Sequence, residues 1–266
     1  CCIILWVTEA LPFIVTVVLI YVLLPMTGVL PFATTTLENG AVVQSVFNQS
    51  SLMVPIYCLF IFAVTAAVMA TPIPFRVANA VLKWSKGDSR KIVVGLMMVT
   101  GIFSMFIADL AASAIFVGIS LSIVEANNGV KKLSGLGKAL TLGIPAAALI
   151  GGIGTPLGNS SNMLVISMLE TAIGFRVTFL GWCIANIPLA LAVTFLSSLW
   201  IVRVFKLEDI KQDAYLVVES KLEGIQGITV KEIKLIVWYV IAFGLMIAST
   251  WLPQINSIMV ALIFCV

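Results

Sequence analysis

The segment that decides the fold reads GGIGTPLGNSSN at residues 151–162, in the middle of the apolar stretch 139–169. It contains four glycines, one proline and five side chains that carry a hydroxyl or an amide group. A plain lipid-facing helix cannot have this sequence, because irregular backbone at membrane depth survives only inside protein or beside a water-filled cavity. The segment therefore predicts two half-helices joined by an unwound loop.

The composition of the 266-residue chain is that of a membrane protein. Apolar residues make up 61% of the chain and charged residues 10%, and there is no histidine. A soluble domain has about 45–50% apolar and about 25% charged residues. The composition excludes a soluble enzyme and a nucleic-acid-binding protein, and the lack of histidine excludes imidazole-based catalysis. We expect a multi-pass protein in the lipid bilayer of a cell membrane, such as a bacterial inner membrane.

Apolar stretches alternate with short polar segments along the whole chain, which predicts an all-α membrane protein. Each stretch has at least the roughly 20 residues that one crossing needs. The predicted elements are spans at 11–30, 52–71 and 177–202, a helical hairpin at 92–124, the broken helix at 139–169, a polar linker at 206–234 and a further apolar run from 235. Both ends of the chain lie in apolar runs, so we expect a piece of a longer protein.

The basic residues predict which segments face the cytoplasm. Of the 15 Lys and Arg, 14 lie in the segments 76–91, 131–138 and 203–234, and the exception is Arg176. The positive-inside rule places these three segments in the cytoplasm. In 76–91, apolar residues recur at helical spacing among the basic ones, which predicts an amphipathic helix on the membrane surface.

The stretch 92–124 begins and ends on the cytoplasmic side in this topology. Two full crossings would need about 40 residues and a turn, but the stretch has 33. We therefore expect a re-entrant hairpin that turns near residues 106–110, where Asp109 is the one acidic residue deep in an apolar segment. Secondary transporters hold substrate and coupling ion between broken helices near the midplane. The hairpin and the loop at 151–162 thus predict one shared site.

Three segments resemble the divalent anion–sodium symporter family, which carries dicarboxylates, citrate and sulfate. WVTEALP at residues 6–12 resembles the opening of the family, FSMFIADLA at 103–111 its hairpin tip, and GGIGTPLGNSSN its broken-helix loop. The resemblance implies an inverted-repeat secondary transporter in which each repeat has a re-entrant hairpin and a broken helix. Residues 1–205 would form the first repeat and residues 235–266 would begin the second. It also implies a homodimer.

The resemblance also assigns the candidate site. Ser104 and Gly158 match family positions that contribute a hydroxyl and a backbone carbonyl to a sodium site. The family has Ser-Asn-Thr at the hairpin tip, where this chain has Ala108, Asp109 and Leu110. The expected sodium ligands are Ser104, Asp109 and Gly158, and no other cofactor is expected. The candidate cation and substrate site comprises Ser104, Ala108, Asp109, Leu110, Gly154, Thr155, Gly158, Asn159 and Asn162.

Asp109 leaves the mode of coupling open. A carboxylate binds a hard cation more strongly than an amide does, but it also repels an anion and can take up a proton. We predict a secondary active transporter of small anions driven by a sodium or proton gradient. The alternative is a proton-coupled exchanger or an arsenite-type permease of the same superfamily. An intramembrane aspartyl protease would need a second facing aspartate, so we expect no enzyme.

Each of these features also has a structural alternative. An ion pair with a basic residue elsewhere would make Asp109 a structural residue, although intramembrane carboxylates are functional by default. Close helix packing of the small-xxx-small kind would explain the glycines at 151–158.

Overall fold

A computed structural model describes residues 22–23, 26–27, 35–36, 42–43, 49–128, 134–207, 229–251 and 260. The motif at 6–12, most of the predicted span 11–30 and most of the linker 206–234 lie outside the described residues. The chain divides into two compact units, Cys1–Pro55 and Ile56–Val266.

The first unit contains one short strand pair. Strands β1 (Thr35–Thr36) and β2 (Val42–Val43) run antiparallel, with Thr35 opposite Val43. The strand pair lies in the polar connector that follows the first predicted span. Helix α3 (Gln49–Met69) begins in this unit and continues into the second, over the stretch predicted as the span 52–71.

The described part of the second unit is helical. Three helices, α6, α7 and α9, are long and apolar enough to cross a membrane, and the bent pair of α3 and α4, with 62° between its helices, adds a fourth candidate span. These helices confirm the predicted all-α membrane protein. The helices are α4 (Ile73–Ser85), α5 (Ser89–Ser104), α6 (Asp109–Asn128), α7 (Gly135–Gly152), α8 (Ser160–Ile173), α9 (Phe179–Val204) and α11 (Val230–Ala248).

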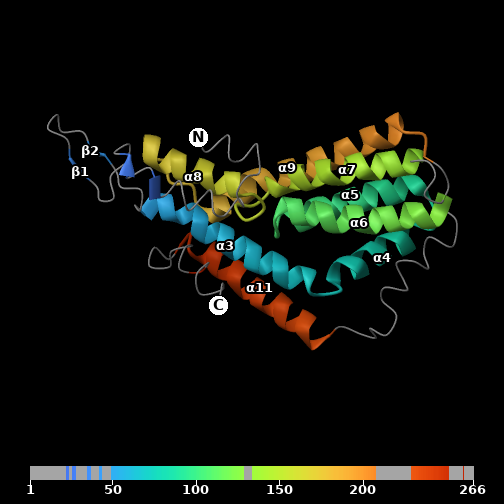
Figure 1. The fold of residues 1–266 in the computed structure, drawn as a ribbon, viewed down its shortest axis with the longest axis horizontal. Coiled ribbons are helices and arrows are strands. Elements are labelled where there is room, and N and C mark those ends of the chain that lie inside the picture. Colours follow the sequence, from blue (N-terminus) through green and yellow to red (C-terminus); the bar gives the residue numbers. More distant parts are fainter. Residues whose placement is uncertain are drawn as a thin grey trace. The chain divides into compact units, whose positions relative to one another are not determined.

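Helices α5, α6, α7 and α9 pack side by side around the main apolar core (Figure 1). Leu96, Met97 and Phe116 are fully buried in this core. At the far end of α5 and α7, a Cβ atom built on Gly151 would lie 2.1 Å from the carbonyl oxygen of Gly101. The two helices therefore touch backbone to backbone. Glycine permits this approach, which is the usual basis of close helix packing in membranes.

The predicted hairpin is formed by α5 and α6, which the short connection 105–108 joins. Asp109 is the first residue of α6, at the predicted turn. The two helices extend beyond the predicted bounds 92–124, and α6 by itself is long enough to cross a membrane. Re-entry from the cytoplasmic side stays a prediction.

The helix break is present where the sequence predicted it, but α7 is not a half-helix, because it is by itself long and apolar enough to cross a membrane. Helix α7 ends at Gly152, and α8 begins at Ser160 after a non-helical loop at residues 153–159. Asn159 caps α8, because its side-chain oxygen accepts a hydrogen bond of 2.8 Å from the Ser161 N–H. The loop thus ends at a defined helix start.

The prediction of one amphipathic helix over residues 76–91 is wrong in the extent of the helix. Helix α4 ends at Ser85, and the next two residues have positive φ angles, 51° at Lys86 and 91° at Gly87. A right-handed helix cannot continue through left-handed backbone. The side chain of Asp88 then caps the start of α5. The apolar residues at helical spacing end at Trp84, before this break, so their periodicity supported a helix only up to there.

Candidate functional site

Four helix ends meet where the hairpin touches the broken helix. We call this region, residues 104–110 and 151–162, the junction. Helices α5 and α7 end here, whereas α6 and α8 begin here. Carbonyl-rich C-terminal ends favour cations and N-terminal ends favour anions. A meeting of both kinds of helix end can therefore face a cation and an anion at neighbouring positions.

Hydrogen bonds join the hairpin tip to the loop of the broken helix. The Asp109 N–H donates to the Gly158 carbonyl at 3.2 Å. The Asn159 side-chain amide donates to Oδ2 of Asp109 at 2.7 Å. The Thr155 hydroxyl donates to the carbonyl of Met105, the residue after α5. The structure thus brings together the two elements that the sequence predicted to share a site.

The carboxylate of Asp109 is half-buried and keeps hydrogen-bonding capacity. Its Oδ1 accepts from the Leu110 N–H at 2.8 Å, and its Oδ2 accepts from Asn159. Each carboxylate oxygen has a second lone pair. Within the described ranges, no lysine or arginine forms an ion pair with Asp109. The contacts of this carboxylate are therefore with neutral donors, which leaves its charge open to a bound cation.

Atoms of the three residues predicted as sodium ligands lie around one point beside Gly152; for Asp109 this atom is Cβ, which bears the carboxylate. A Cβ atom built on this glycine would lie 3.3 Å from Ser104 Oγ, 3.3 Å from Asp109 Cβ and 3.4 Å from the Gly158 carbonyl oxygen. Hard cations prefer oxygen ligands of these kinds. The Ser104 hydroxyl is fully buried and donates to the Ala148 carbonyl at 2.5 Å, so the lone pairs of its oxygen remain available.

Three further predicted residues hold the loop in shape. Asn162 is buried, and its amide donates to the carbonyls of Gly152 and Thr155 at 2.8 Å each. Thr155 is fully buried. A Cβ atom on Gly154 would lie 3.0 Å from Met105 Cγ, so this position packs against the hairpin connection. The side chains of Asn162 and Thr155 thus satisfy backbone carbonyls near the helix break.

The remaining two predicted residues contribute backbone groups. The Ala108 N–H donates to Thr65 Oγ1 of α3 at 3.1 Å. Leu110 supplies its N–H to Asp109, and its residue surface is 78% exposed. Side-chain hydroxyls at these positions, as the family has them, are absent here.

Sequence reasoning missed several residues that support the junction. Thr65 holds the hairpin connection from α3, and Trp182 donates from Nε1 to the Ile153 carbonyl at 2.9 Å. The Tyr239 hydroxyl of α11 donates to the Phe106 carbonyl at the hairpin tip. Gly152 was part of the quoted motif but not of the predicted site. These partners lie 29 to 133 positions away in the chain, so no local pattern could identify them.

A cation at the junction would depend on one carboxylate. Among the described residues, no group of three or more His, Cys, Asp and Glu lies close enough to hold a metal ion. A multivalent metal centre usually needs several such ligands. One carboxylate with a hydroxyl and carbonyls instead suits a monovalent cation.

Comparison with known proteins identifies the family. The model of a family described as "Citrate transporter" matches residues 3–266. The chain belongs to this family. The sodium-dependent dicarboxylate transporter of Staphylococcus saprophyticus is 28% identical over 205 residues, which cover 74% of this chain and 37% of that protein. Its counterpart in Staphylococcus aureus strain USA300 is 29% identical over 213 residues, which cover 77% and 39%.

These matches confirm the resemblance on which the candidate site was predicted. The family and these relatives are transporters and not enzymes, in agreement with the prediction. The chain spans about two-fifths of the length of the relatives that it matches.

Proposed function

We propose that this citrate-transporter family member acts in secondary active transport of small anions of the dicarboxylate, citrate and sulfate class, coupled to a sodium gradient. The observation that carries the proposal is that Ser104 Oγ, the Gly158 carbonyl oxygen and the Asp109 Cβ atom, which bears the carboxylate, lie around one point beside Gly152. Two relatives are sodium-dependent dicarboxylate transporters by name, which supports both sodium and a carboxylate substrate.

The charge of Asp109 supplies a physical reason for coupling. Two unit charges 4 Å apart interact by about 4 kcal/mol at an effective dielectric constant of 20. A bare carboxylate at the junction would therefore weaken the binding of an anionic substrate strongly. A bound sodium ion would neutralise this repulsion, and the N-terminal ends of α6 and α8 would then attract the anion. Cation binding would thus favour anion binding.

Proton coupling is the second candidate. The observation that favours it is again Asp109, because this chain has a titratable carboxyl where the family has an amide. Protonation would remove the same charge that sodium would neutralise. A proton-coupled exchanger or an arsenite-type permease of the same superfamily would operate in this way.

The setting of the complete protein is part of the proposal. The candidate spans and the bacterial relatives support a multi-pass protein of a bacterial inner membrane. A small carboxylate is the proposed substrate. A homodimer follows from the resemblance to the family.

The test measures uptake of radiolabelled succinate, citrate and sulfate by the complete protein in proteoliposomes, under an inward sodium or proton gradient at several pH values. The sodium gradient should drive uptake by the wild-type protein. Asp109→Asn should flatten the pH dependence and keep part of the sodium dependence, because an amide oxygen still coordinates. Asp109→Leu should abolish coupled uptake.

Glu125→Gln is the matched control, because this exposed carboxyl lies near the other end of α6. It should transport like the wild type. Normal coupled uptake by Asp109→Leu would refute the proposal. Uptake driven by protons in the complete absence of sodium would favour the second candidate.

A further inference from the structure

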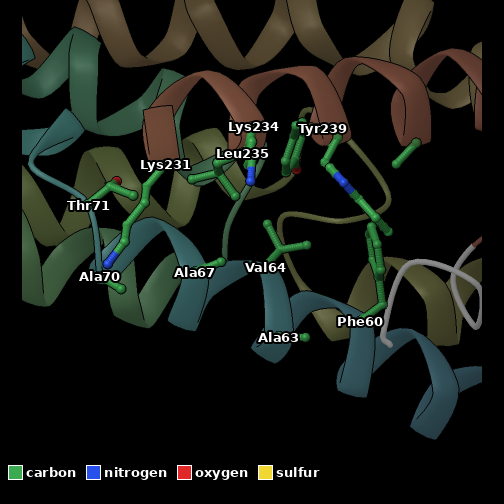
Figure 2. Close-up of a pocket in the computed structure, with 12 residues that line it drawn as sticks. Phe60, Ala63, Val64, Ala67, Ala70, Thr71, Lys231, Lys234, Leu235 and Tyr239 are labelled. Carbon is green, nitrogen blue, oxygen red and sulfur yellow. The ribbon is translucent and has the colours of Figure 1, made fainter. Parts of the chain in front are cut away.

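A groove separates α3 from α11 (Figure 2). Its volume is about 510 Å³. Phe60, Val64 and Ala67 line it from α3, and Leu235 and Tyr239 line it from α11. Small side chains on α3 leave the space open, and its walls over most of its length are apolar.

One end of the groove is cationic. Lys231 and Lys234, in the first two turns of α11, line it opposite Ala70 and Thr71, which follow the last residue of α3. In Figure 2 both lysine side chains extend from α11 toward α3. Neither lysine forms an ion pair within the described ranges. The carboxylate between them in sequence, Glu232, is already bonded to Arg76 and Thr229.

The length of the groove matches one leaflet of a bilayer. The lining residues of α11 extend from Lys231 to Ala242. The distance between these two positions along the helix axis is about 16 Å at a rise of 1.5 Å per residue. The hydrocarbon core of a bilayer is about 30 Å thick, so one leaflet is about 15 Å. The groove therefore offers positive charge at one end and an apolar wall of acyl-chain length beyond it. The basic segment that precedes α11 places the charged end on the cytoplasmic side.

We propose that this groove binds an acidic phospholipid of the cytoplasmic leaflet. Its phosphate lies between Lys231 and Lys234, and one acyl chain follows the apolar face of α3. Basic pockets between membrane helices on the cytoplasmic side bind lipid head groups in this way. An apolar helix in the same groove would leave both ammonium groups without a counter-charge. The proposal is independent of the transported substrate and of the coupling ion.

The test of the charged end is lipid titration of the complete protein in mild detergent, followed by native mass spectrometry. Phosphatidylglycerol should bind, and phosphatidylcholine with the same acyl chains should bind far more weakly. The double variant Lys231→Gln/Lys234→Gln should weaken phosphatidylglycerol binding by about 30-fold, at about fivefold for each charge. The control Lys138→Gln/Lys206→Gln makes the same charge change at two exposed lysines outside the groove. It should bind phosphatidylglycerol like the wild type.

The apolar wall is tested by a substitution that fills the groove with a larger side chain and leaves both lysines in place. Ala67→Phe places a ring among the lining residues of α3. Ala66→Phe, the control, adds the same ring at an exposed position of α3 that does not line the groove. Only Ala67→Phe should lower phosphatidylglycerol binding. Each control carries the same kind of substitution as its variant. A loss of binding that appears in both would therefore indicate destabilisation of the fold.

Several results would overturn the proposal. Equal binding of phosphatidylglycerol and phosphatidylcholine would remove the role of the lysines. Displacement of bound phosphatidylglycerol by millimolar glycerol 3-phosphate would indicate a site for a soluble anion instead. Absence of any lipid on the wild-type protein would mean that another protein segment fills the groove. Equal loss of binding in a variant and its control would assign the effect to general destabilisation.

Discussion

The side-chain amide of Asn159 donates a 2.7 Å hydrogen bond to Oδ2 of Asp109, 50 positions away in the chain. Asn159 also caps α8, and Asp109 is the first residue of α6. One contact thus joins the start of a hairpin helix to the start of a half-helix. Under the proposed function, a cation that binds the Asp109 carboxylate would act on both helices at once, and this pair would link ion binding to the geometry of the junction.

Gly152→Ala should weaken sodium binding. The added methyl group would lie 3.3 Å from both Ser104 Oγ and Asp109 Cβ and would enter the space between the predicted ligands. If overpacking of this kind, which costs about 1–3 kcal/mol, falls on the sodium-bound form, the sodium concentration for half-maximal uptake should rise about fivefold or more.

Gly118→Ala is the matched control for Gly152→Ala, because a Cβ atom there has nothing within 4 Å. It should leave the sodium dependence of uptake unchanged. A sodium affinity of Gly152→Ala within twofold of the wild type would contradict the proposed site.

Asn162→Ala should destabilise the broken helix. The buried amide of Asn162 satisfies the carbonyls of Gly152 and Thr155. A buried carbonyl without a partner costs about 1–3 kcal/mol. The midpoint of thermal unfolding in detergent should therefore fall for Asn162→Ala and stay unchanged for Ser161→Ala, whose side chain is exposed. Equal midpoints for Asn162→Ala and the wild type would show that the amide does not hold the loop.

Glu232→Gln should lower the thermal stability at neutral pH and have little effect in acid. Glu232 is 1% exposed, and its Oε1 accepts from Arg76 Nε at 2.9 Å. The hydrogen bond from the Thr229 N–H is the largest influence on the pKa of Glu232, and it lowers that pKa. Desolvation raises the pKa, but the Thr229 hydroxyl and Arg76 lower it further, so the pKa of Glu232 lies below its ordinary value. A depressed carboxyl pKa stabilises the fold above the unfolded value of about 4.3, and this contribution disappears as the pH falls through the folded pKa.

The check on this prediction compares unfolding midpoints of Glu232→Gln and the wild type from pH 7 down to pH 3. The difference should be largest at pH 7 and should shrink toward pH 3. Glu170→Gln, an exposed carboxyl on α8, should show no such trend. A difference that stays constant with pH would assign the effect to packing rather than to charge.

Cysteine labelling should establish the orientation. In a cysteine-free background of the complete protein, Lys86→Cys should react with a membrane-impermeant maleimide only from the cytoplasmic side. Arg176→Cys should react only from outside. Both residues are exposed, and the positive-inside rule assigns them to opposite sides. Labelling of Lys86→Cys in intact cells would reverse the predicted topology.

The sequence by itself determined the class of protein, the broken helix and the hairpin. These features depend on local properties. Apolar length predicts a membrane helix, and the clustering of glycines, Pro156 and polar side chains at 151–162 predicts a break in it. The motifs at 103–111 and 151–162 also predicted the family, which the comparison confirmed.

Only the tertiary structure decided which atoms meet. The amide of Asn159 reaches Asp109, Thr65 supports Ala108, and Tyr239 bonds to Phe106 across 133 positions. The end of α4 at Ser85 also escaped prediction, although the apolar spacing stops at Trp84 and Gly87 follows the left-handed Lys86. Contacts of this kind depend on how helices approach one another. That approach is set by close backbone packing such as that of Gly101 against Gly151; a local pattern can mark a small residue but does not identify its partner on another helix.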